Sequence, residues 1–267
     1  MDRRDFLTLA CLLPAGTVLA APAAPVAAGL SLPAAINKAG RQRLLSQRTA
    51  KAWLMLVQGV LSEKAKSILG QSTQLFEQQL VELKTLQPND DCRVAWLLLE
   101  QEWGRYRPQL ADIRSDAKAV WTGSEAVLAA AQKLTAAYER TAGTPGGHLV
   151  NLAGRQRMLS QRAAKAFFFR NMGVNAGEAG QMLDGAMKEF IKVHEELKAA
   201  PQNTPQIKSD LALVEQQWFF FQHALSLREA YDQRAAMIYL RPATSYLRSA
   251  SAASLFQEDA DLRVSRN

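Results

Sequence analysis

The chain has 267 residues, of which 48% are hydrophobic and 21% charged, an ordinary composition for a soluble globular protein with a core. The formal net charge of +7 points to an anionic partner, whether a membrane surface, a nucleic acid or a small anion. The two cysteines, Cys11 and Cys92, exclude an internal disulfide in the mature protein, because Cys11 lies in a segment that we expect to be removed.

Residues 1–28 have the layout of a secretory signal peptide, with a short basic start, an apolar stretch from Phe6 to about Leu19, and a run of small residues. Arg3 and Arg4 resemble a twin-arginine export signal, and we favour that route over the general one. No later stretch has the ~20 apolar residues that a membrane-spanning helix needs. We therefore expect a periplasmic protein, soluble after cleavage, and this compartment argues against a nucleic-acid partner.

The first half of the remaining chain is predicted to be helical. Alanine, leucine, glutamine, glutamate, lysine and arginine dominate it, and β-branched residues are sparse. Pro33 falls in the first turn of the first helix, where its missing N–H has no consequence, and Pro108 should bend the third helix. The four expected helices cover about residues 33–61, 62–86, 92–115 and 118–141.

Residues 143–147, Gly-Thr-Pro-Gly-Gly, are the clearest break in the chain, and we expect a domain boundary there. In the second half, the expected helices cover about residues 148–172, 176–199, 204–231 and 232–254. Pro242 interrupts the last of these, and no strand is predicted. The predicted fold is all-α: two tandem antiparallel four-helix-bundle repeats, at residues 30–142 and 148–262.

The two halves are copies of one another. Residues 36–48, Ile-Asn-Lys-Ala-Gly-Arg-Gln-Arg-Leu-Leu-Ser-Gln-Arg, recur as residues 150–162, Val-Asn-Leu-Ala-Gly-Arg-Gln-Arg-Met-Leu-Ser-Gln-Arg. Further matches surround the pairs Phe76/Phe190 and Trp103/Trp218, the second pair one residue out of register. The duplication therefore spans most of each half.

An arginine falls in the middle of an apolar helical stripe in each copy. At about 100° per residue, the stripe in the first copy contains Ile36, Ala39, Gly40, Arg43, Gln47, Ala50 and Leu54. An arginine buried there is unfavourable unless its charge and N–H groups are met, either by a carboxylate or by a bound anion. The carboxylates that could pair with Arg43 or Arg157 from another helix include Glu82, Glu100, Glu196 and Glu215. The residues alone leave both alternatives open.

The candidate ligand-binding residues are Arg43, Arg157, Gly40, Gly154, Gln47 and Gln161. The glycines remove side-chain bulk one turn before each arginine, which leaves room for a small ligand or a close helix, and the glutamines add amide donors one turn after it. The secondary basic residues are Arg41, Arg48, Arg155 and Arg162. We interpret the flanking face, which includes Lys51, as a solvated basic surface.

Residues 36–43, Ile-Asn-Lys-Ala-Gly-x-x-Arg, resemble the P-box of nitrate/nitrite sensor histidine kinases of the NarX type. Residues 151–162 resemble the N-terminal sensory domain of PilJ-type, type IV pilus methyl-accepting chemotaxis transducers. In the nitrate sensors, P-box helices of two subunits face each other and one arginine from each grips a single anion. The resemblance implies that Arg43 and Arg157 take this role, with nitrate or nitrite as ligand.

Family members usually carry membrane helices and a cytoplasmic signalling part, which the sequence lacks. We expect the duplication to replace the dimer, so that the helices of Arg43 and Arg157 pair within one chain and share one anion. The alternative is that the halves stack end to end and each pairs with a second chain, as in a homodimer. A membrane sensor or a pilus-linked protein is the expected partner.

The sequence also allows two other classes of function to be compared with anion sensing. In the first, the protein is a periplasmic scaffold that binds a partner through its helices, and the arginines make structural ion pairs. In the second, it is an enzyme, which we reject because the three histidines are scattered and no catalytic or nucleotide-binding fingerprint is present. No metal site and no cofactor are predicted.

Two aromatic runs, residues 167–169 and 218–221, are too broad for a single core stripe. We expect most of these side chains in the core, with an exposed patch at Phe169 or Phe221.

Overall fold

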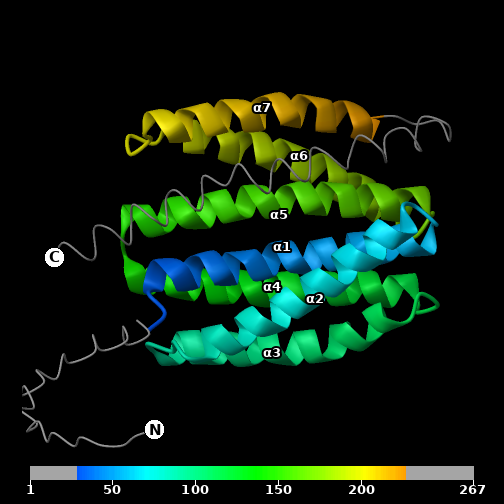
Figure 1. Cartoon of the computed structure of the whole chain (residues 1–267), viewed down its shortest axis with the longest axis horizontal. Helices are drawn as coiled ribbons and strands as arrows, with labels where there is room; N and C mark the ends of the chain where they lie inside the picture. The colour runs from blue at the N-terminus through cyan, green and yellow to red at the C-terminus, as the bar shows by residue number, and fades with distance from the viewer. Residues whose placement is uncertain (1–28, 227–267) are drawn as a thin grey trace, which may run out of the picture.

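The computed structural model describes residues 29–226 of the chain, and this part is all-helical, with seven helices and no strand (Figure 1). The helices are α1 (Leu32–Val57), α2 (Ser62–Lys84), α3 (Asp90–Ala111), α4 (Ala117–Ala142), α5 (Pro145–Asn171), α6 (Ala176–Ala199) and α7 (Pro205–Ser226). The expectation of an all-α fold is therefore confirmed. None of the described helices is long and apolar enough to cross a membrane.

The two repeats meet along their first helices, α1 and α5, which run side by side in the same direction (Figure 1). α1 also packs against α2 and α4, while α5 packs against α6. α3 completes the first bundle by packing against α4, and α7 lies next to α6. The helices that carry the repeated arginine motif thus pair within one chain, as expected from the duplication, and the halves are not stacked end to end.

The helix ends follow the local capping chemistry. Ser31 caps α1 by accepting a hydrogen bond from the backbone N–H of Ala34, at 3.4 Å. Asn89 caps α3 in the same way, with its side chain 2.9 Å from the N–H of Cys92. α3 ends at Ala111 instead of near residue 115, because Asp112 is extended and its carboxylate accepts the N–H of Arg114 at 2.8 Å.

The break between the repeats is shorter than the sequence suggested. Gly143 ends α4 in the left-handed conformation, with φ of 58°, which favours glycine. Thr144 then caps α5 by accepting the N–H of Gly147, so the helix begins at Pro145 and not at residue 148. The glycines at 146 and 147 form its first turn. The predicted helix at 232–254, its interruption at Pro242 and the signal peptide lie outside the described residues.

The core of each repeat is built around an equivalent aromatic pair. Phe76 of α2 stacks on Trp103 of α3, with ring centroids 3.8 Å apart. Phe190 of α6 stacks on Trp218 of α7, with centroids 3.5 Å apart. All four side chains are buried. The duplicated sequence therefore produces duplicated packing, in which one stack joins α2 to α3 and the other joins α6 to α7.

The exposed aromatic residues differ from those expected. Phe169 and Phe221 are both fully buried, so the prediction of a patch at either position was wrong. Phe169 packs edge-on against Trp121 of α4, because α5 has neighbours on several sides. The exposed pair is Phe219 and Phe220, which are 69% and 60% exposed on α7.

Replacing Phe190 with alanine should destabilise the protein by about 3–5 kcal/mol, because the stack on Trp218 is lost and a cavity remains. Urea unfolding monitored by circular dichroism measures the change. Phe219→Ala is the matched control, since this ring is exposed, and its effect should stay within about 0.5 kcal/mol. Equal losses in both variants would contradict the assignment of the core.

Candidate functional site

The predicted stripe of α1 is fully buried, and its centre lies against α5. Ile36, Ala39, Arg43, Gln47, Ala50 and Leu54 are all 0% exposed, and Gly40 is also buried. α1 contacts α2, α4 and α5, so most of its circumference is covered. The interpretation of the stripe as a helix-packing face is therefore correct, and an arginine does lie in the middle of it.

The two helices approach most closely at the repeated glycines. A Cβ atom on Gly154 would lie 3.8 Å from the Cα of Gly40, 3.2 Å from Nη2 of Arg43 and 3.9 Å from Nη2 of Arg157. A Cβ on Gly40 would lie 3.0 Å from the same Nη2 of Arg43. The space created by the missing side chains is thus used by a guanidinium group, and both arginines reach one point between the helices.

Arg43 has an acceptor for each of its three nitrogens. Nη1 donates to Oε1 of Gln132 on α4 at 2.6 Å, and Nη2 donates to the backbone carbonyl of Asn151 on α5 at 3.1 Å. Nε donates to the carbonyl of Gly40 at 3.4 Å. All three acceptors are neutral, so they satisfy the hydrogen bonds of Arg43 but leave its charge uncompensated.

Arg157 has fewer partners. Its Nη2 donates to Oδ1 of Asn37 on α1 at 3.0 Å, while its Nε is buried and has no acceptor among the described residues. The two links are related by the duplication, because Asn37 and Asn151 are equivalent, as are Arg43 and Arg157. Each arginine therefore reaches the equivalent asparagine of the other repeat.

Within residues 29–226, no carboxylate lies within ion-pair distance of Arg43 or Arg157. The four candidates are engaged elsewhere or lie on the surface. Glu82 pairs with Lys38 at 2.7 Å, Glu196 contacts His148, and Glu215 contacts Lys198. Glu100 is exposed. For this part of the chain, the alternative of a structural ion pair with one of these residues was wrong.

Burial and like charges disfavour the protonated form of both arginines. Burial, together with the charges of Arg155 and Arg157, lowers the pKa of Arg43 to about 9, and the carboxylates of Glu139 and Glu189 oppose this shift. Burial also lowers the pKa of Arg157 to about 10, with a contribution from the charge of Arg41. Both groups remain charged at pH 7, and the site is strongly electropositive.

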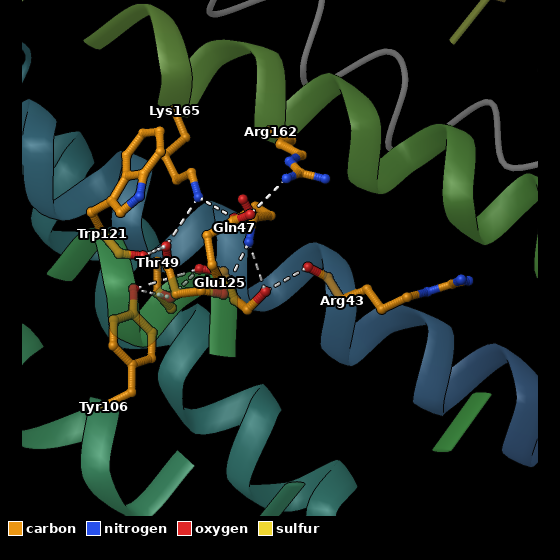
Figure 2. Close-up of polar contacts among 10 residues, drawn as sticks. Arg43, Gln47, Thr49, Tyr106, Trp121, Glu125, Arg162 and Lys165 are labelled. Atoms are coloured by element: carbon orange, nitrogen blue, oxygen red, sulfur yellow. Dashed lines mark hydrogen bonds and ion pairs between the residues drawn. The ribbon is translucent and has the colours of Figure 1, made fainter. Parts of the chain in front are cut away.

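The two glutamines form a second polar layer further along the helices. Gln47 donates to Oγ of Ser46 and to the backbone carbonyl of Ser124, both at 3.1 Å. Gln161 accepts a hydrogen bond from Nζ of Lys51 at 2.7 Å. Figure 2 shows the guanidinium of Arg43 pointing away from this layer. The structure therefore brings the arginines and glycines together and places the glutamines beside a lysine and a serine.

A buried cation in this layer was not expected from the sequence. Lys165 is 0% exposed, and its Nζ donates to Glu125 of α4 at 2.6 Å and to Oγ of Ser124 at 3.0 Å (Figure 2). The same carboxylate accepts a hydrogen bond from Arg162 at 2.6 Å, and Nζ of Lys165 lies 5.2 Å from the centre of the Trp121 ring. This cluster ties α5 of the second repeat to α4 of the first.

The prediction of a solvated flanking surface was wrong. Lys51 is only 6% exposed, and the four secondary arginines are half-buried. Arg155 pairs with Glu189 of α6, and Arg162 pairs with Glu125. The cause is that α1 and α5 are each covered by several helices, which a periodic pattern on one helix does not show. The burial of Lys51 and Lys165 could have been predicted from one feature of the sequence: both lysines occupy the same position in the two repeats, one turn after the glutamines.

Comparison with known protein families shows to which family this chain belongs. The family model described as "Type IV pili methyl-accepting chemotaxis transducer N-term" matches residues 30–142 and 144–246, one segment for each repeat. The chain belongs to this family, PilJ. No curated protein and no solved structure matches it.

Membership of the PilJ family supports a role in signalling, since such domains belong to chemotaxis transducers. It also confirms the resemblance to the pilus transducers and its two repeated segments. The resemblance to the P-box of nitrate sensors is not part of this match.

The described part of this PilJ-family chain contains no group of three or more His, Cys, Asp and Glu residues arranged to hold a metal ion. His148 bridges Glu139 and Glu196 across α4, α5 and α6. Nδ1 of His194 accepts a hydrogen bond from the side-chain amide of Gln156 at 2.8 Å.

The buried lysine gives a pH-dependent prediction. Burial lowers the pKa of Lys165 from 10.5 to about 8, although Glu125 opposes this shift. The folded protein then releases this proton at a lower pH than the unfolded chain does. Relative to Lys165→Met, the wild type should therefore gain roughly 1–2 kcal/mol of stability between pH 7.5 and 9.5.

Urea unfolding of both proteins at these two pH values measures the difference. Lys118→Met is the control, because Lys118 is exposed and its loss should leave the pH dependence of the wild type unchanged. Parallel stability curves for the wild type and Lys165→Met would show that Lys165 keeps its ordinary titration.

Proposed function

We propose that this PilJ-family protein is a sensory protein that binds one small oxyanion, nitrate or nitrite, between Arg43 and Arg157. The observation that carries the proposal is the pair of buried guanidinium groups whose Nη2 atoms lie within 4 Å of one point. No carboxylate among the described residues neutralises either of them. A bound anion would supply the missing negative charge.

The physical case rests on the cost of unpaired buried charge. A guanidinium group withdrawn from water is unfavourable unless hydrogen bonds and an opposite charge compensate it. Neutral amide and carbonyl acceptors supply hydrogen bonds to Arg43 and Arg157 but no charge. Guanidinium donors match the planar geometry of an oxyanion and stay protonated at neutral pH. Arg41 and Arg155 add to the positive potential around the site.

The arrangement of the helices supports one site per chain. α1 and α5 lie parallel with their glycines opposite each other, and Arg43 and Arg157 each cross to the other repeat. In nitrate sensors of the resembling type, two subunits are needed to bring two arginines to one anion. We propose that the duplicated chain provides both arginines itself.

The remaining parts of the proposal concern location and output. We propose that residues 1–28 direct the protein to the periplasm by the twin-arginine route, on the basis of their signal-peptide layout. The proposed partner is a membrane sensor or a pilus-linked protein, in keeping with the signalling role of the family. We propose no catalytic activity and no cofactor.

One observation favours a second function, that of a scaffold without a small ligand. Arg43 is fully buried, and all three of its nitrogens are hydrogen-bonded within the chain. Under this alternative, the arginines serve only to join the repeats, and the exposed helices bind a protein partner.

Calorimetric titration of the purified protein with sodium nitrate and sodium nitrite separates the two functions. We expect one anion bound per chain, and no binding by the double variant Arg43→Ala/Arg157→Ala. Nitrate at a hundred times its Kd should also stabilise the fold by about 2.7 kcal/mol, which a rise in Tm would report. Sodium chloride at equal ionic strength is the control for salt effects.

Arg93→Ala is a matched control variant, because Arg93 lies on the exposed face of α3 and pairs only with Asp90 among the described residues. It should bind nitrate like the wild type. Absence of heat and of thermal stabilisation with the wild type would reject anion sensing and favour the scaffold.

A further inference from the structure

We propose that the two arginines have different roles in this site: Arg157 supplies the hydrogen bonds to the anion, whereas Arg43 supplies positive charge and uses its own hydrogen bonds to hold α1 and α5 together. This inference rests on the proposed function and assigns the residues of that site. It follows from three independent comparisons between the arginines: their hydrogen bonds, the charges around them and the space that they occupy.

The hydrogen bonds show that the donors of Arg43 are already in use. Its Nη1 bonds to Gln132 of α4, its Nη2 to the carbonyl of Asn151 on α5, and its Nε to Gly40. The side chain thereby joins α1 to α4 and α5 from a fully buried position. An anion that took these donors would break the hydrogen bonds to Gln132 and to Asn151, both of which are partly buried.

The donors of Arg157 are largely available. Only Nη2 has an acceptor among the described residues, the side chain of Asn37. Its Nε is buried without one, which is rare for a charged donor in a folded protein. Nε and the adjacent Nη form the edge of a guanidinium group that binds two oxygens of a planar oxyanion at once. In Arg157, Nε is therefore a donor of such an edge that lacks an acceptor among the described residues.

The charged groups around the two arginines also differ. Arg43 feels the carboxylates of Glu139 and Glu189, which partly offset the repulsion from Arg155 and Arg157. Arg157 is repelled by Arg41 and, because the repulsion between the two arginines is mutual, by Arg43 as well. Arg157 is also the more exposed of the two, at 9% against 0%, which makes it the easier one for an anion to reach.

The glycines explain why the arginines are not equivalent. Nη2 of Arg43 lies between Gly40 and Gly154, where it fills the space that two Cβ atoms would take. The pseudo-twofold relation of the repeats would place Arg157 in the same gap, but one guanidinium group already occupies it. Arg157 must therefore lie to one side, where its donors remain open. One site holds one fixed arginine and one anion-binding arginine.

The test compares Arg157→Gln with Arg43→Gln in the full chain, using nitrate as the ligand and calorimetry as the readout. Arg157→Gln should weaken nitrate binding at least roughly tenfold and leave Tm within about 2 °C of the wild type. Arg43→Gln should lower Tm by several degrees, because it removes the hydrogen bonds that join α1 to α4 and α5, and should weaken binding by a smaller factor than Arg157→Gln does.

A second variant keeps the role of Arg43 testable if Arg43→Gln does not fold. Gln132→Ala removes the acceptor of Nη1 and leaves both arginines in place. It should lower Tm and bind nitrate with nearly wild-type affinity. Arg93→Gln, at an exposed position of α3, should change neither quantity.

The outcomes separate this inference from the proposed function. Equal loss of binding in the two arginine variants, with nitrate bound by the wild type, would overturn only the division of roles. Stronger loss in Arg43→Gln than in Arg157→Gln would reverse it. A wild-type protein that binds no nitrate would overturn the proposed function, and with it the role of Arg157.

Discussion

The close parallel contact of α1 and α5 is the constraint on which the rest of the structure depends. Two glycines allow the helices to approach, and the space between them holds the guanidinium of Arg43. Buried charge at a helix contact is unfavourable by itself, so the surrounding chain must supply acceptors. It does so with Gln132, Asn151 and Asn37, one from α4 and two from the repeated motif itself. The outer helices then cover this contact from both sides.

Duplication within one chain changes what such a contact can do. In a symmetric dimer every substitution appears twice, and the two halves of the interface stay identical. Here the repeats have diverged: Lys165 donates to Glu125 of α4, in the first repeat, whereas its equivalent, Lys51, donates to Gln161 of α5, in the second. The arginines differ in the same way in their number of partners. A single chain can therefore combine a fixed half and an open half at one interface, which two identical subunits cannot do without breaking their symmetry.

The sequence predicted well those features that depend on one helix or on its repetition. The stripe around Arg43 was correctly assigned to a helix contact, because its period reports which side is buried. Features that depend on which helices become neighbours were not predictable. Glu82, one of the expected partners of Arg43, pairs instead with Lys38 of the same helix as Arg43. Lys51 is buried and not solvated, because α1 is covered by α2, α4 and α5. The end of α3 at Ala111 depended on a local bond from Arg114 to Asp112.

The location of the site also bears on how binding can act on the protein. A ligand shifts a conformational balance only by its difference in affinity between two states. An anion between α1 and α5 contacts both repeats at once, so its binding energy depends directly on how the repeats are held against each other. The Lys165–Glu125 pair, in the next polar layer, joins the same two repeats through α4 and α5. Under the proposed function, the arginine layer senses the ligand, while the lysine layer limits how far the repeats can move apart.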